Sequence, residues 1–269
     1  MLEHKTQNWH VRKPLVHGRG GIVATQNRIA GQAGARVFAN GGNAVDAAVT
    51  TAFALAAVEP WNSGLGGVGF MLIYSAKEDR VRVVDFGPVS PVGCNPAHYP
   101  LVGGGVTTRD LFTWPSVKDD CNVHGPLSFA VPGEVDGLGL ALERFGTLKL
   151  GEALQPAIEL ADQGIAVDWF LTLKVATMVR ELARYPTTRE IWLPEGYPPA
   201  TPPGASLGRL KLTGLADTLR RLAVAGRRDF YEGEIAAGIV KDIKALGGVI
   251  APEDLRRYQA RIVEPLMTE

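Results

Sequence analysis

The chain has 269 residues, of which 46% are hydrophobic and 21% charged, as in globular proteins long enough to bury a substantial core. Its 28 basic and 28 acidic residues cancel, so the composition favours neither a nucleic-acid partner nor an anionic membrane surface. The two cysteines, Cys94 and Cys121, are too few for a disulfide framework or a metal cluster, and the five histidines lack metal-binding spacing. One bridge between the cysteines is compatible with the sequence but not required by it.

Residues 1–20 are expected to form an extended lead-in. They contain no apolar core of signal-peptide length, so a cytoplasmic location is expected. Residues 21–25 predict a short buried strand, and Asn27 can cap a helix that runs to about Asn40. The pair Gly41-Gly42 is typical of the end of such a helix.

Residues 41–69 are the most informative stretch, with the sequence GGNAVDAAVTTAFALAAVEPWNSGLGGVG. Asn43 is a good helix cap, and Asp46 lies where a carboxylate meets the free amides of a first turn. From residue 44 to residue 58 no face is polar, which predicts a helix buried on nearly all sides. Asp46 and two threonines make it a poor membrane span. Pro60 restricts the residue before it and ends the helix.

Residues 64–69 spell GLGGVG, which matches the dinucleotide-binding pattern G-x-G-x-x-G. That pattern binds a pyrophosphate only where a strand precedes it and a helix follows. Here a predicted helix precedes it and the strand-like FMLIY follows. We therefore interpret these glycines as a tight passage from helix to strand and not as a nucleotide site.

Two strands are predicted at residues 70–75 and 81–86, joined by the charged turn 77–80 into a hairpin. Their apolar runs are too continuous for a sheet with one face in water, so we expect helices to cover the sheet. Residues 87–122 are rich in glycine, proline and polar residues and predict a long surface loop, with a helical turn near 96–99.

The second half is predicted to be mostly helical. A short strand at 129–131 and an irregular proline-rich stretch at 185–205 are its exceptions. Helices are expected at residues 135–145, 150–164, 168–183, 214–225, 234–245 and 252–258. This order of elements predicts an α+β layered domain that extends from residue 21 to residue 269.

The stretch at 41–69 resembles the start of the large subunit in the gamma-glutamyltranspeptidase family. That family carries a Gly-Gly-Asn-Ala-x-Asp-Ala-Ala helix, then Glu-Pro, then a Ser-Gly-x-Gly-Gly-x-Gly-Phe turn. The resemblance continues from about residue 21 to residue 265, with matches at Val131-Pro132-Gly133, Pro156-Ala157-Ile158, Leu160-Ala161, Leu193-Pro194, Leu215-Ala216, Thr218-Leu219, Phe230-Tyr231-Glu232-Gly233, Gly247-Gly248, Asp254-Leu255 and Tyr258.

The resemblance implies an N-terminal-nucleophile hydrolase with a layered αββα core. In such proteins a precursor cuts itself, and the threonine exposed at the start of the small subunit attacks an amide carbonyl. The free amine of that threonine is the general base, so no cofactor or metal is implied. The expected partners are a small subunit carrying the catalytic threonine and a small-molecule amide substrate, with no nucleic acid and no membrane.

No catalytic residue is expected within this chain. The pairs Thr50-Thr51, Thr107-Thr108 and Thr187-Thr188 lack the Thr-Thr-His-like start of a small subunit, and nothing after Thr268 could build a site. In the family, further strands of the large subunit follow the part that resembles residues 258–265. We therefore expect residues 1–269 to be the N-terminal portion of such an enzyme, as a separate product, a fragment or one chain of an assembly.

Substrate contacts are expected after residue 86. In true gamma-glutamyl enzymes, Asp-Phe at the end of the strand is followed by an arginine that clamps the substrate α-carboxylate. Here Asp85-Phe86 is followed by the candidate substrate-binding residues Gly87, Pro88, Val89 and Ser90. Gly87 stands at the arginine position, which predicts an acyl pocket without this clamp. The alternative is that Arg109 replaces the clamp.

Loss of the clamp agrees with related members that act on other amides, such as cephalosporin acylases and oxamate amidohydrolases. The leading hypothesis is an amide hydrolase or acyltransferase that is not a strict gamma-glutamyl enzyme. The competing hypothesis is a non-catalytic scaffold that binds a partner or peptide. A threonine-started segment in the neighbouring coding sequence would favour the enzyme.

Overall fold

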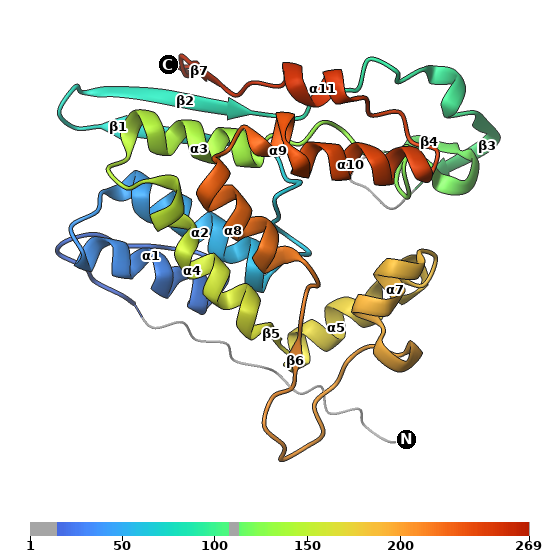
Figure 1. The fold of residues 1–269 in the computed structure, drawn as a ribbon, viewed down its shortest axis with the longest axis horizontal. Helices are drawn as coiled ribbons and strands as arrows, with labels where there is room; N and C mark the ends of the chain where they lie inside the picture. Colours follow the sequence, from blue (N-terminus) through green and yellow to red (C-terminus); the bar gives the residue numbers. More distant parts are fainter. Residues whose placement is uncertain (1–14, 108–112, 269) are drawn as a thin grey trace, which may run out of the picture.

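The computed structural model describes residues 15–107 and 113–268 and has an α+β fold (Figure 1). Its main sheet consists of β1 (Gly69–Ser75), β2 (Arg80–Phe86) and β7 (Arg261–Val263), in the order β1-β2-β7 with antiparallel neighbours. Leu72 pairs with Val83, which in turn pairs with Val263. Because side chains alternate along a strand, these three residues lie on one face of the sheet.

Helix α2 (Ala44–Val58) is the centre of the core, as predicted. The side chain of Asn43 accepts from the N–H groups of Val45 and Asp46, while the Asp46 carboxylate accepts from the Asn43 N–H at 2.8 Å. This reciprocal cap fixes the start of the helix. Val49 and Phe53 are fully buried. The neighbours of α2 are α1 (Arg28–Ala39), α3 (Glu134–Phe145) and α4 (Leu150–Gln163).

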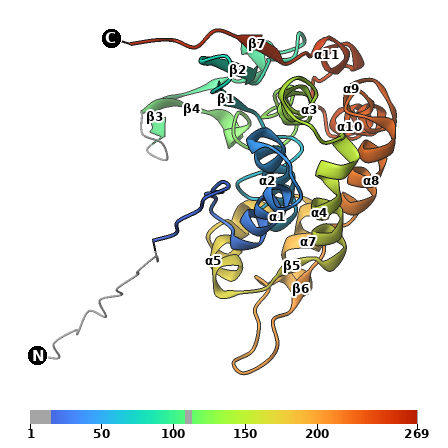
Figure 2. The ribbon, with the colours of Figure 1, turned by 90° about the vertical axis from the view of Figure 1, so that its left-hand side faces the viewer.

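Helix α3 lies between the sheet and α2, and it contacts both β1 and β2 (Figures 1 and 2). Helix α8 (Leu215–Ala225) packs on α4, and three further helices continue the helical layer: α9 (Asp229–Glu232), α10 (Glu234–Ala245) and α11 (Pro252–Arg257). One large hydrophobic cluster joins these helices to the inner face of the sheet.

A smaller unit lies at the end of the molecule away from the sheet (Figure 1). It contains β5 (Ile165–Ala166), α5 (Trp169–Thr177), α6 (Val179–Leu182), α7 (Pro186–Trp192), a 3-10 turn (Pro194–Gly196) and β6 (Arg209–Leu210). Leu171, Val175 and Leu193 are among the buried residues of its own hydrophobic cluster.

The α+β class with a mostly helical second half is confirmed, and the hairpin of β1 and β2 forms where it was expected. Residues 21–25 do not form the predicted strand, because no strand of the described residues pairs with them, and Ile22 is exposed. The strand expected at 129–131 reduces to one bridge between Val89 and Val131.

Three further predictions about secondary structure are wrong in detail. The loop at 87–122 contains the predicted turn (Pro96–His98) but also β3 (Leu101–Thr107), β4 (Trp114–Val117) and a second turn (Lys118–Asp120). The helix expected at 168–183 breaks at Met178 into α5 and α6. The stretch at 185–205 was expected to be irregular, but Pro186 occupies a favourable first-turn position and starts α7.

The sheet is covered by helices on one face only. On the other face Phe70, Leu72 and Tyr74 of β1 are 65%, 69% and 61% exposed. The prediction of a sheet with neither face in water is therefore wrong for this chain taken by itself. We call this outer surface, made by Phe70, Leu72, Tyr74 and their cross-strand neighbours Val81 and Val83, the open face.

No helix among the described residues is both long and apolar enough to cross a membrane. Cys94 and Cys121 are free thiols.

Candidate functional site

The segment that follows β2 carries the predicted substrate-binding residues and is fixed at its first residue. The Gly87 N–H donates to Asp85 Oδ1 at 3.0 Å, and the Tyr258 hydroxyl donates to the Gly87 carbonyl at 2.9 Å. Tyr258 is itself stacked on the buried Tyr231, with ring centroids 5.4 Å apart. The backbone at Gly87 is therefore held from both sides, by the partly buried Asp85 and by Tyr258 of the core.

The same segment is fixed at two later points. The Val131 N–H donates to the Val89 carbonyl at 2.8 Å, and the Val92 N–H donates to Asp254 Oδ1 at 2.9 Å. The other oxygen of Asp254 accepts from the Ala251 N–H and so caps α11. Residues 87–92 thus form a wall whose shape is set before a ligand arrives.

A cavity of about 690 Å³ lies against this wall. It brings together four of the five predicted substrate-binding residues, Gly87, Pro88, Val89 and Ser90. The remaining lining residues come from β1, β2, the segment after β2, the residues before α3, the segment around α11 and β7: Phe70, Asp85, Val92, Val131, Asp254, Arg257, Tyr258, Gln259 and Arg261. The fifth predicted residue, Arg109, lies outside the described residues.

The cavity opens onto the open face of the sheet. Phe70 pairs with Asp85, and Asp85 pairs with Arg261, so these three residues form one row across β1, β2 and β7. All three line the cavity. A protein layer laid over the open face would therefore also close this cavity.

The cavity has charged residues on two sides, Asp85 and Arg261 on the sheet and Asp254 and Arg257 on α11. Arg261 Nη2 lies 2.5 Å from Asp85 Oδ2. The Gly87 N–H and then the Arg261 guanidinium hold the pKa of Asp85 below its ordinary value, against the effect of burial. Burial, together with the carboxylates of Asp136 and Asp85, raises the pKa of Tyr258 to about 12. Asp85 is thus an anion and Tyr258 a neutral hydrogen-bond donor at neutral pH.

Position 87 has room for a side chain. A Cβ atom there would lie 3.3 Å from Asp85 Oδ1 and 3.5 Å from Phe70 Cζ. The contact with Phe70 is an ordinary van der Waals contact, and the tighter one requires the Asp85 carboxylate to shift by a few tenths of an ångström. In this chain the guanidinium beside Asp85 belongs to Arg261 of β7, and Gly87 contributes no side chain.

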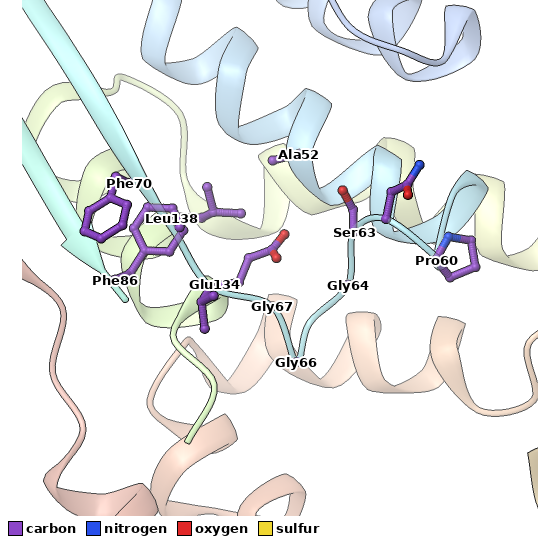
Figure 3. A pocket seen from close by; sticks show the side chains of 13 residues that line it. Ala52, Pro60, Ser63, Gly64, Gly66, Gly67, Phe70, Phe86, Glu134 and Leu138 are labelled. Atoms are coloured by element: carbon purple, nitrogen blue, oxygen red, sulfur yellow. The ribbon is translucent and has the colours of Figure 1, made fainter. Parts of the chain in front are cut away.

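A second cavity, of about 680 Å³, lies next to the first and shares Phe70 with it (Figure 3). It is bounded by α2, by the glycine passage of residues 64–69 and by the start of α3. Its wall includes Glu134, which is only 9% exposed. The interpretation of the passage as a close-packed turn holds at Gly67, where a Cβ atom would lie 2.0 Å from Glu134 Oε2 and 2.8 Å from the Gly64 carbonyl oxygen. It does not hold at Gly64 and Gly66, where a Cβ atom would have no neighbour within 4 Å.

Reasoning from the sequence missed Glu134, and it gave Arg261 no place in the site. Glu134 directly follows Val-Pro-Gly, and an acid in the first turn is typical of helices in general. Nothing in the sequence therefore indicated that this acid is buried. Arg261 is separated from Asp85 by 176 positions, and only the pairing of β2 with β7 brings them together. Among the described residues, no group of three or more His, Cys, Asp or Glu side chains could hold a metal ion.

The chain is similar in fold and sequence to enzymes of one class. The fold matches that of the gamma-glutamyltranspeptidase from Helicobacter pylori with a TM-score of 0.83 and 29% identity, over 94% of this chain and 68% of that one. Two curated relatives are the glutathione hydrolase proenzyme of Bacillus subtilis strain 168, 31% identical over 93% of this chain, and the acylase ACY 1 proenzyme of Pseudomonas sp. strain V22, 35% identical over 95% of this chain. The fold is thus that of the N-terminal-nucleophile hydrolases of this type.

The sequence pattern of the family described as Gamma-glutamyltranspeptidase matches residues 30–269. This chain belongs to the gamma-glutamyltranspeptidase family. It spans 40% of the length of the Bacillus relative and 44% of that of the Pseudomonas relative.

Proposed function

We propose that this chain is the large-subunit portion of an amide hydrolase or acyltransferase whose catalytic threonine is supplied by a separate small subunit. The observation that carries the proposal is the open face. It is apolar, and it continues into the cavity lined by Gly87, Pro88, Val89 and Ser90. Exposed apolar surfaces of this kind mark places where another protein layer packs.

In the proposed enzyme the small subunit lays its own sheet on the open face and places its first residue at the cavity beside Gly87. The threonine hydroxyl attacks the amide carbonyl and its α-amine takes the proton, so that an acyl-enzyme forms and an amine leaves. Water then releases the acyl group as an acid, or a second amine takes it as a new amide. This chain contributes the rigid wall at 87–92 and the paired charges of Asp85 and Arg261.

We further propose that γ-glutamyl groups are poor acyl donors for this enzyme. An α-carboxylate that enters the pocket must lose its water, and position 87 offers no guanidinium to compensate. The relatives named glutathione hydrolase and acylase indicate that members of the family serve different acyl groups. The proposed substrates are simple acyl amides without an α-amino acid head.

The first test compares the chain alone with the chain co-expressed with the threonine-started segment of its neighbouring coding sequence. We expect no turnover of any acyl anilide by the purified chain, because the nucleophile and the oxyanion donors are absent. The co-expressed pair should release the aniline. Turnover by the chain alone, with no second polypeptide visible by mass spectrometry, would contradict the proposal. An inactive but stable pair would favour the scaffold instead.

The second test measures specificity constants of the active pair for a γ-glutamyl anilide and a simple acyl anilide. The natural protein should prefer the simple acyl group, and Gly87→Arg should improve the γ-glutamyl substrate by about tenfold or more, since each 1.4 kcal/mol of recovered interaction is a factor of ten. The new guanidinium would share Asp85 with Arg261, so Gly87→Arg should be made with and without Arg261→Gln. Efficient γ-glutamyl turnover by the natural protein would contradict the idea and make Arg109 and Arg261 the next residues to change.

A further inference from the structure

The cavity around Glu134 has no role in the function proposed above. Figure 3 shows the Glu134 side chain pointing into the space between α2 and the glycine passage, on the side where Ala52 and Ser63 lie. Pro60, Asn62 and Phe86 are also among its walls. Among the described residues that line it, Glu134 is the one titratable side chain.

The Glu134 carboxylate is held in place by the passage that surrounds it. The Gly64 N–H donates to this carboxylate, and the Gly67 carbonyl accepts from the N–H groups of Gly133 and Glu134, each at 2.9 Å. A carboxylate offers about four acceptor positions, so the bond from Gly64 leaves capacity for a further donor. The acid is thus fixed and buried, and it can still accept hydrogen bonds from a ligand.

The walls of the cavity define the ligand that suits it. Asn62 and Ser63 add neutral polar groups, and the described lining contains no cationic side chain that could pair with Glu134. A buried carboxylate without a cationic partner is costly, and a bound cation with N–H donors reduces this cost. We propose that this cavity binds the ammonium group of a substrate, with Glu134 as its counter-ion.

This inference rests on the proposed function, because the substrate is one of the two reactants of acyl transfer. Phe70 lines both this cavity and the cavity beside Gly87, so a ligand in one lies next to a ligand in the other. The ammonium group can come from two sources, the amine that accepts the acyl group or an amino group on an acyl donor that has no α-carboxylate. Both sources offer the same chemistry to Glu134.

Protonation of Glu134 controls the proposed binding. Burial raises its pKa to about 7, although the Gly64 N–H opposes the rise. Affinity for an ammonium ion should therefore increase as the pH rises through about 7, and fall again only where the ammonium ion loses its own proton. The carboxylate of Glu59 does not line the cavity. It contacts the lining residue Asn62, whose side-chain amide nitrogen lies 3.4 Å from Glu59 Oε2.

The test uses Glu134→Gln, which keeps the shape and an acceptor for the Gly64 N–H but removes the charge. Glu143→Gln is the matched control, because Glu143 lies on the same helix, is exposed and pairs with Arg227. In the active pair at pH 8, Glu134→Gln should raise the KM of an amine acceptor, or lower the preference for an acyl donor that carries an amino group but no α-carboxylate, by about tenfold or more. Hydrolysis of an uncharged acyl anilide should stay unchanged.

A second readout does not depend on turnover. Ethylammonium chloride should raise the Tm of the natural chain at pH 8 above its value in sodium chloride of equal concentration, and Glu134→Gln should abolish the difference. In the kinetic test, a raised KM of the acceptor identifies the acceptor as the source of the ammonium group. A lowered preference for the amino-bearing donor identifies the donor as its source. The inference is overturned if ethylammonium gives no specific stabilisation, or if Glu134→Gln alters all substrates equally. An inactive pair with a Glu134-dependent ethylammonium effect would instead contradict only the proposed function.

Discussion

Helix α2 and strand β1 have a similar apolar composition and opposite environments. In α2, eleven of fifteen residues are buried, whereas every second residue of β1 from Phe70 to Tyr74 is more than 60% exposed. The difference follows from where their neighbours are encoded. The helices that enclose α2 belong to this chain, and the layer that would cover the outer face of β1 does not belong to its described residues. Apolar composition thus predicts that a surface needs a partner, without telling which chain supplies it.

The largest expected effect comes from breaking the enclosed element. Val49 is fully buried in α2, so Val49→Asp places an unpaired charge in the core. The cost is on the order of several kcal/mol, comparable with the ~5–15 kcal/mol stability of a whole domain. We expect Val49→Asp to be insoluble or to lack a cooperative melting transition. A soluble, cooperatively melting variant would show that α2 is not enclosed.

The same type of change on the open face should have a different result. Leu72→Lys introduces a charge where the side chain is already in water, so the stability of the chain should change by no more than about 0.5 kcal/mol. Association with the small subunit should be lost, because the charge would be buried in the proposed interface. Pull-down from co-expressing cells measures this directly. Leu246→Lys is the control, since Leu246 is similarly exposed, 62% against 69% for Leu72, but lies at the end of α10. Equal pull-down of both variants would rule out the open face as the interface.

The elements with local signals were predictable from the sequence. The Asn43 cap, the proline after Glu59 and the charged turn of the hairpin are features of a few neighbouring residues, and the elements they bound form as expected. The strand predicted at 21–25 failed because a strand needs a partner, and the sequence of a strand does not reveal whether one is available. The hairpin of β3 and β4 was missed for the converse reason, since its residues carry weak strand signals and are stabilised by each other.

Only the contiguous segment of the candidate site was predictable from the sequence. The segment at 87–90 was found because Asp85-Phe86 resembles the pair that precedes the clamping arginine in the family, and the structure places this segment in a cavity. Its companions Asp254, Tyr258 and Arg261 are far away in sequence, and tertiary packing alone brings them to Gly87. The sequence also does not show how many hydrogen bonds a buried carboxylate accepts from its neighbours.

Two buried acids near helix starts sharpen this last point. Asp46 is fully buried, and burial alone would raise its pKa, but hydrogen bonds from Leu148, Asn43 and Thr147 outweigh that effect and lower it. Glu134 accepts from the Gly64 N–H, and burial raises its pKa to about 7. The two acids should therefore give stability opposite dependences on pH. Asp46 supports the fold at neutral pH and loses this contribution as the pH falls below the usual range of aspartate.

The last predicted effect concerns the dependence of stability on the pH and follows from Glu134. Its pKa in the folded chain lies above the ordinary value of 4.5, so between about pH 4.5 and pH 7 the folded state binds more protons than the unfolded state. Stability should fall as the pH rises through this window, by at most about 3 kcal/mol. Glu134→Gln should remove this contribution and be the more stable protein at pH 8, whereas Glu143→Gln should keep it. Denaturant melts of the three proteins at pH 5 and pH 8 measure the difference. If Glu134→Gln and the natural chain lose the same stability between these two pH values, the carboxylate is already ionised at pH 5, and the ammonium site would have to bind without the predicted dependence on pH.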